Sequence, residues 1–214
     1  MPDSTTTASP WLRDLLAATS QAIVPDDPDF GAFTPWTVLM ATTTLTPVRE
    51  GRAYDLAQFA GVYLVAWFGD DVPPAGPADP FDRHVVYIGR TRTRPIAARW
   101  ANLLAGIGTG SGHSGGNTLH EELHRVGLLE TGASGRFHVA ALPVWVTGTA
   151  PDPTTGRPAQ ADARQLCFRT AALEALLIEA VSDLRRRKQL PALANEPSLL
   201  EDPTTAFRLV RPES

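Results

Sequence analysis

Two apolar segments on either side of a proline-rich stretch constrain the fold of this chain most strongly. Residues 61–68 (GVYLVAWF) and 84–89 (HVVYIG) are rich in β-branched and aromatic side chains, which are typical of strands. Residues 69–82 between them are rich in proline, glycine and aspartate, and we expect no regular structure there. Residues 36–45 and 136–148 are further strand candidates. These segments predict a small central sheet, antiparallel or mixed.

Helical patterns fill much of the remaining sequence. We expect an N-terminal helix after Ser9, a basic loop and helix over 90–105, a glycine-rich loop over 106–116, a short helix over 117–129 that begins at Asn117 or Thr118, and a long helix over 163–189. The predicted fold class is therefore mixed α/β of the α+β kind, a small sheet flanked by helices.

The bulk properties indicate one domain with additional arms. The chain has 214 residues, of which 43% are hydrophobic, and a net charge of −4, so nothing global indicates nucleic-acid binding. We divide it into a partly helical N-terminal extension (1–55), a main domain (56–200) and a C-terminal tail (201–214). Cys167 is the single cysteine, which excludes an intrachain disulfide. The N-terminus resembles no secretory signal and no apolar run could span a membrane, so we expect a cytoplasmic protein.

One short motif suggests zinc chemistry. His120, Glu121 and His124 spell H-E-x-x-H, a spacing that puts two imidazoles on one helix face beside a potential general base. A third ligand would have to be Glu130 or His138. The motif therefore admits a zinc metallopeptidase, although a polar helix whose histidines face solvent is the simpler interpretation.

Four separated pieces of sequence, followed by an asparagine, point to a different chemistry. GVY (61–63) begins the first predicted strand, and YIG (87–89) ends the second. RW (99–100) follows on a predicted helix, EALLI (174–178) has the form E-x-x-L-I, and a proline is followed closely by Asn195. Together, in this order, the pieces resemble the GIY-YIG nuclease superfamily over roughly two thirds of the chain.

The resemblance implies an endonuclease that hydrolyses phosphodiester bonds in DNA, or in RNA, with one divalent metal ion. Glu174 would bind a single Mg²⁺ or Mn²⁺, with water completing the coordination. Tyr63 would position or deprotonate the attacking water, and Tyr87 would orient the water or a phosphate oxygen. Arg99 would contact the phosphate through its planar fork.

Further side chains are candidates for substrate binding. Arg90, Arg92 and Arg94 lie within ten residues of Arg99, which predicts a phosphate-tracking patch on an otherwise acidic chain. Many members of the family carry a histidine one turn after the arginine, where this chain has Leu103. His113 in the glycine-rich loop is a candidate replacement, and Asn195 is a further candidate contact.

The periodicity of the long helix gives a separate argument about the glutamate. At about 100° per residue, an apolar stripe forms from Leu173, Leu176, Leu177, Ala180, Val181 and Leu184. Glu174 lies on the flank of this stripe, from which a carboxylate can reach a pocket between helix and sheet. The basic run 185–188 ends the same helix and suits either its negative C-terminus or DNA.

Two alternatives to the nuclease remain open. The chain could be a nucleic-acid-binding module that keeps the fold without catalysis, which the missing histidine and the acidic composition favour. It could also be the zinc metallopeptidase suggested by residues 120–124. In either nucleic-acid role the N-terminal extension could support a homodimer or help to grip the substrate.

Overall fold

The computed structural model describes residues 32–40, 43, 56–128, 137–144 and 163–194. Its elements are β1 (Thr37–Val38), the 3₁₀ helix η2 (Leu56–Gln58), β2 (Gly61–Trp67), β3 (Val85–Arg90), α2 (Ile96–Thr109), α3 (Ser114–Arg125), β4 (Phe137–Pro143) and α4 (Ala163–Arg187). The predicted N-terminal helix, most of the extension and the tail lie outside the described residues. No helix among the described residues is long and apolar enough to cross a membrane.

The four strands form one antiparallel sheet in the order β1-β4-β2-β3, so β3 is an edge strand. The β2–β3 pairing joins Tyr63 to Gly89 and Val65 to Tyr87, and a bulge follows at Val65 and Ala66. The sheet and its helices confirm the predicted α+β class. As expected, residues 69–82 contain no helix and no strand, apart from one bridge between Pro77 and Pro35.

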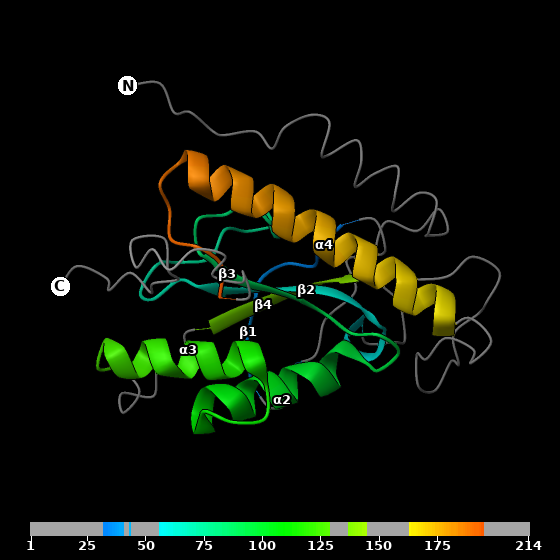
Figure 1. Ribbon diagram of the computed structural model, residues 1–214, viewed down its shortest axis with the longest axis horizontal. Helices are drawn as coiled ribbons and strands as arrows, with labels where there is room; N and C mark the ends of the chain where they lie inside the picture. The colour runs from blue at the N-terminus through cyan, green and yellow to red at the C-terminus, as the bar shows by residue number, and fades with distance from the viewer. Residues whose placement is uncertain (1–31, 41–42, 44–55, 129–136, 145–162, 195–214) are drawn as a thin grey trace.

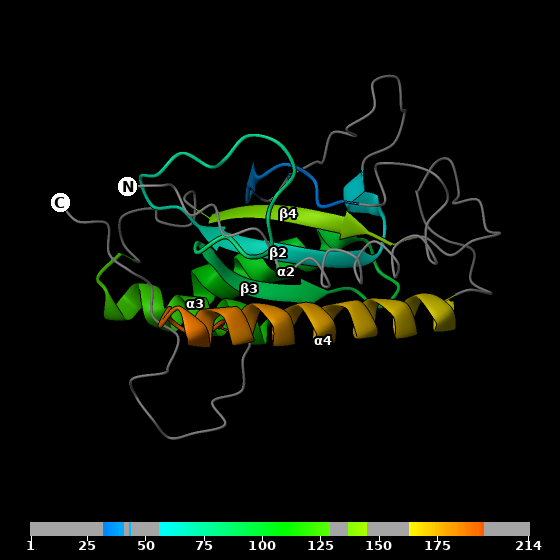
Figure 2. The ribbon, with the colours of Figure 1, turned by 90° about the horizontal axis from the view of Figure 1, so that it is seen from above.

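Helices cover both faces of the sheet (Figure 1). Side chains of β2 alternate between the two faces, so Tyr63 and Val65 join one core with α2 and α3, while Val62 and Leu64 join another core with α4. Figure 2 shows α4 lying along the β3 side of the sheet. At the β3 edge, side chains of α4 can therefore come close to side chains that lie on the α2–α3 face of the sheet.

The corner between α2 and α3 differs from the predicted glycine-rich loop. Helix α2 continues to Thr109, and α3 begins at Ser114 with His113 as its N-cap, instead of the expected cap at Asn117 or Thr118. Glycines serve here for close packing: a Cβ on Gly106 would lie 3.1 Å from the Cα of Gly116. Counting glycines as loop signals was therefore wrong for both helix ends.

Helix α4 packs through a narrower stripe than the sequence indicates. Leu173, Leu177 and Val181 are buried, but Leu176, predicted to share the stripe, is 37% exposed. Glu174 is half-buried at the edge of the stripe, in the expected position. Apart from Ser182, which adjoins Val181, the buried positions of α4 are three or four residues apart, as a single stripe along a helix requires.

The end of α4 closes part of the β3 edge. Arg185 is buried, and its Nη1 donates to the carbonyl oxygen of Val85 over 2.7 Å. The chain then turns back, and the backbone N–H of Ala194 donates to the carbonyl oxygen of Val86, also over 2.7 Å. Of the basic run 185–188, the first arginine is thus structural.

Candidate active site

The β2–β3 hairpin puts two tyrosines on one face of the sheet. Tyr63 and Tyr87 both point to the α2–α3 side, and their ring centroids lie 6.1 Å apart. Tyr63 is fully buried and Tyr87 is nearly so. The glycine opposite Tyr63 makes room for this arrangement, because a Cβ on Gly89 would lie 2.5 Å from Tyr63 Cζ and 2.6 Å from Tyr87 Cε1. The glycine of the YIG piece therefore has a steric reason.

Helix α2 brings an arginine to the two phenols. Trp100 is buried and packs edge-on against Tyr63 with centroids 6.2 Å apart, which anchors the helix beside the sheet. The preceding Arg99 is half-buried, and its charge acts on the hydroxyls of both Tyr63 and Tyr87. The sequence predicted a role for Arg99. It did not predict that Trp100, its neighbour in the RW pair, anchors α2 against Tyr63.

Both tyrosines remain phenols in the free protein. Burial raises the pKa of Tyr63 well above its usual value, the neighbouring Tyr87 raises it further, and Arg99 opposes both effects only in part. Burial likewise raises the pKa of Tyr87, against the lowering effect of Arg99. At neutral pH each hydroxyl is therefore a hydrogen-bond donor rather than a ready base.

An ion pair joins β3 to α4 at the sheet edge. The Nε of Arg90 donates to Oε2 of Glu174 over 2.7 Å, and the two side chains are 21% and 23% exposed. Burial raises the pKa of Glu174, while the hydrogen bond from Arg90 and the charges of Arg90 and Arg99 lower it. Glu174 in turn raises the pKa of Tyr87, so the carboxylate belongs to the same electrostatic environment as the phenols.

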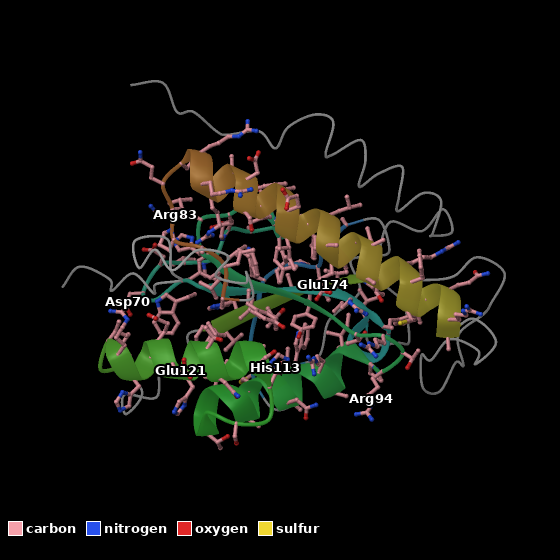
Figure 3. The ribbon with its side chains drawn as sticks, viewed as in Figure 1. Asp70, Arg83, Arg94, His113, Glu121 and Glu174 are labelled. Carbon is pink, nitrogen blue, oxygen red and sulfur yellow. The ribbon has the colours of Figure 1, made fainter. Side chains whose placement is uncertain are left out.

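The start of α3 adds a histidine to this group. His113 is 3% exposed, and its ring packs edge-on against Tyr87 with centroids 5.9 Å apart. Burial, and then the charge of Arg99, lower its pKa to about 4. We call Tyr63, Tyr87, Arg90, Arg99, His113 and Glu174 the β3-edge site. Figure 3 shows His113 and Glu174 near the middle of the molecule, with Asp70 and Arg83 at its far end.

Buried donors without partners are concentrated in and beside the β3-edge site. Tyr63 Oη, Arg90 Nη1, His113 Nε2 and Trp100 Nε1 are buried and have no hydrogen-bond partner among the described residues. Leaving a buried polar group unpaired costs about 1–3 kcal/mol, so such groups are uncommon. Several unpaired donors beside two arginines make a site suited to an anion with several oxygens.

A divalent cation bound at this site would take few of its ligands from the protein. In the described part of the chain, no group of three or more His, Cys, Asp or Glu side chains is arranged to hold a metal ion. Mg²⁺ and Mn²⁺ accept oxygen ligands and commonly keep several waters, so one carboxylate together with substrate phosphate is a workable set. The arginine bonded to Glu174 Oε2 would have to share or release that oxygen.

The other predicted substrate contacts lie outside this cluster. Arg92 and Arg94 are exposed in the segment that leads into α2, where Arg94 is labelled in Figure 3. They extend the positive charge of Arg90 and Arg99 along the surface. Asn195 lies outside the described residues.

The H-E-x-x-H motif, residues 120–124 (HEELH), lies on α3, after the helix start that carries His113. His120 donates from Nδ1 to the carbonyl oxygen of Ile107 over 2.8 Å, while Glu121 and His124 are exposed. His138 shares its sheet face with Ala140, which packs on the α4 side, so it lies across the sheet from α3. It therefore cannot be the third ligand, and the other candidate, Glu130, lies outside the described residues.

No family model matches this chain, and no curated protein or solved structure is significantly similar to it.

Proposed function

We propose that this chain is a divalent-metal-dependent endonuclease of the GIY-YIG type that hydrolyses phosphodiester bonds in DNA. One observation carries the proposal: the rings of Tyr63 and Tyr87 lie 6.1 Å apart, and Arg99 from α2 and Glu174 from α4 lie close enough for their charges to act on the Tyr87 hydroxyl. Side chains from segments this far apart in the sequence have little reason to gather at one sheet edge unless they share a role. The fold of the domain is proposed to be that of the same superfamily.

The chemistry needs a bound phosphate, a positioned water and charge stabilisation in the transition state. Arg99, with Arg90 beside it, neutralises the phosphate oxygens through charge-assisted hydrogen bonds. The buried hydroxyls of Tyr63 and Tyr87 donate to the water or to a phosphate oxygen. Because both phenols stay protonated, we assign them to positioning rather than to proton removal.

Glu174 holds the negative charge that a metal site requires. A bound Mg²⁺ or Mn²⁺ would supply Lewis-acid polarisation of the phosphate and a lowered pKa for its bound water. Glu174 contributes the single carboxylate of the β3-edge site, and its half-buried position at the flank of α4 keeps it open to the surface.

Cleavage of supercoiled plasmid tests this proposal directly. Purified protein is incubated with plasmid, single-stranded DNA or RNA in the presence of Mg²⁺, Mn²⁺ or EDTA. Glu174→Gln is compared with Glu179→Gln, a matched change at an exposed position of the same helix. We expect metal-dependent cutting by the native protein and by Glu179→Gln, and loss of at least about 10²-fold in Glu174→Gln.

Two other outcomes lead to the alternative functions. DNA binding without cutting by any form would indicate a nucleic-acid-binding module, and the bond that already occupies Glu174 favours this second candidate. Hydrolysis that survives Glu174→Gln but disappears in Glu121→Ala would contradict the proposed site and direct attention to the HEELH motif.

A further inference from the structure

His113 caps α3 in a way that fixes its tautomer. The backbone N–H of Gly116 donates to His113 Nδ1 over 3.1 Å. A nitrogen that accepts a hydrogen bond carries no proton, so in the neutral imidazole the proton must sit on Nε2. The helix cap thereby turns the other end of the ring into an N–H donor.

This donor is buried beside the phenols and has no partner. His113 is 3% exposed, and its Nε2 makes no hydrogen bond to any described residue. The ring contacts Tyr87 edge-on, and the charge of Arg99 is close enough to disfavour a second proton on the imidazole. A neutral, buried donor therefore belongs to a ring that contacts a phenol of the β3-edge site and feels the charge of its arginine.

Close packing holds the ring in this place. A Cβ on Gly115 would collide with the ring of Tyr87, and a Cβ on Gly106 would lie 3.2 Å from Cβ of His113. The α2–α3 corner is thus pressed against the tyrosine, and the imidazole has little freedom to turn away. Leu103 of α2 is buried in the core on the same side of the sheet.

Capping alone does not explain an imidazole at position 113. Aspartate would accept the Gly116 N–H equally well and would bring no donor of its own to this buried position. Compared with such a cap, a histidine adds one further polar atom, Nε2. Its presence therefore indicates a ligand that accepts a hydrogen bond from Nε2.

We propose that His113 is a catalytic residue of the β3-edge site that donates a hydrogen bond from Nε2 to a non-bridging oxygen of the bound phosphodiester, and that it transfers no proton. The inference rests on the proposed function for the nature of the ligand. It goes beyond that function in assigning a residue, a tautomer and a role.

Two substitutions at this position separate the donor from the cap. His113→Asn keeps a side-chain oxygen for Gly116 N–H but removes the Nε2 donor, whereas His113→Ala removes both. His124→Asn, at an exposed position of the same helix, is the control. We expect His113→Asn to stay folded and to melt above His113→Ala, because it keeps the cap, and to lower kcat for plasmid cleavage about 10²-fold, with an unchanged pH–rate profile. Full activity in His113→Asn, or loss of one limb of the pH–rate profile in that variant, would overturn the proposal.

A second readout does not depend on cleavage. In protein labelled with ¹⁵N at histidine, we expect a neutral Nε2–H tautomer for His113 at pH 7 and a shift of its Nε2 resonance on titration with inorganic phosphate. A protonated Nδ1, or no shift while phosphate perturbs the other residues of the site, contradicts the donor role. If the native protein fails to cut any nucleic acid yet phosphate shifts His113, the nuclease function fails while the anion-binding role of His113 stands.

Discussion

At the scale of single residues, the β3-edge site is built from groups that are costly to bury. Tyr63 has a fully buried hydroxyl that makes no hydrogen bond of ordinary geometry to a described residue, although Arg99 and Tyr87 lie beside it. Gly89, which has no side chain, leaves room for its ring. A group that only filled the core would be better as phenylalanine. The cost of burying this hydroxyl is the kind of local strain that functional sites often carry.

Tyr63→Phe should therefore reduce activity without reducing stability. Removing an unpaired buried hydroxyl should leave the free energy of unfolding unchanged or raise it by up to about 1 kcal/mol. The same change should lower plasmid cleavage about 10²-fold, because one positioned donor is lost. Urea unfolding and cleavage measured on one preparation check both effects. A clear loss of stability would mean that the hydroxyl is paired in solution and that our account of its role is wrong.

His113 should make the native protein sensitive to mild acid. Its pKa in the folded chain is about 4, below the ordinary value of 6.5 that it has when unfolded. As pH falls from 6.5 to 4, the unfolded chain takes up a proton that the folded chain refuses, so the free energy of unfolding decreases. The groups that face the ring are Tyr87 from β3 and Arg99 from α2.

Urea unfolding between pH 7 and pH 4 measures this sensitivity. We expect the native protein to lose more stability over the range than His113→Asn, which has no imidazole to protonate. Parallel pH dependences in the two proteins would show that His113 is solvated or already protonated.

Arg90 should compete with a metal ion for Glu174. Its Nε occupies Oε2 of the carboxylate, so a cation must displace it or share the oxygen. Arg90→Gln removes the charge, and we expect Mn²⁺ to bind about tenfold more tightly to the free protein, the worth of one charge-assisted hydrogen bond. Electron paramagnetic resonance titration with Mn²⁺ measures this, with Arg92→Gln as the control. Weaker binding in Arg90→Gln would mean that the arginine supports the cation site.

At the scale of elements, glycines decide how closely strands and helices approach. Gly89→Ala should push a methyl group into both tyrosine rings and destabilise the protein by about 1–3 kcal/mol. Cleavage should fall at least tenfold, because the phenols are displaced. Gly108 on α2 is the control, since a Cβ there meets nothing within 4 Å. Gly108→Ala should keep its activity and gain up to about 1 kcal/mol from helix propensity. Thermal melting and cleavage of both variants check the contrast.

The same glycines explain what the sequence could and could not predict. Strand patterns were sufficient for β2 and β3, because buried β-branched runs between turn residues have few alternatives. The extent of α2 and the start of α3 were missed, since Gly106 and Gly116 look like loop residues until the partner helix is known. Leu176 was placed in the core by periodicity, which cannot tell how wide the buried stripe is.

For the candidate site, the sequence could suggest residues but not how they are arranged. Tyr63, Tyr87, Arg99 and Glu174 were recognised from motif pieces, and the fold brings them into one electrostatic environment. The cap that gives His113 its unpaired Nε2 could not be read from the sequence, because it depends on where α3 starts. The Arg90–Glu174 bond joins residues 84 positions apart and needed the three-dimensional fold.

At the scale of the whole molecule, a positive patch lies on a chain of net charge −4. Arg92 and Arg94 are exposed beside the β3-edge site, whereas Arg186 and Arg187 are exposed on α4 next to acidic partners, Glu179 and Asp183. We expect the double change Arg92→Gln/Arg94→Gln to weaken DNA binding and to reduce the slope of log Kd against log salt by about two.

Fluorescence anisotropy at several salt concentrations measures this slope. The matched control, Arg186→Gln/Arg187→Gln, should leave it nearly unchanged, because those charges already have carboxylate neighbours. Equal effects of the two double variants would indicate general attraction rather than a phosphate path leading into the site.

The closure of the β3 edge has a consequence for the behaviour of the protein at high concentration. An open edge strand is a template on which another chain can add a strand, and runs as apolar as β2 and β3 are prone to such self-association. Here Arg185 and the backbone of Ala194 occupy the carbonyl oxygens of Val85 and Val86, and the opposite edge strand, β1, is two residues long. Within the residues that the structure describes, the start of β3 is therefore blocked to strand addition, and we expect this to reduce self-association at high protein concentration.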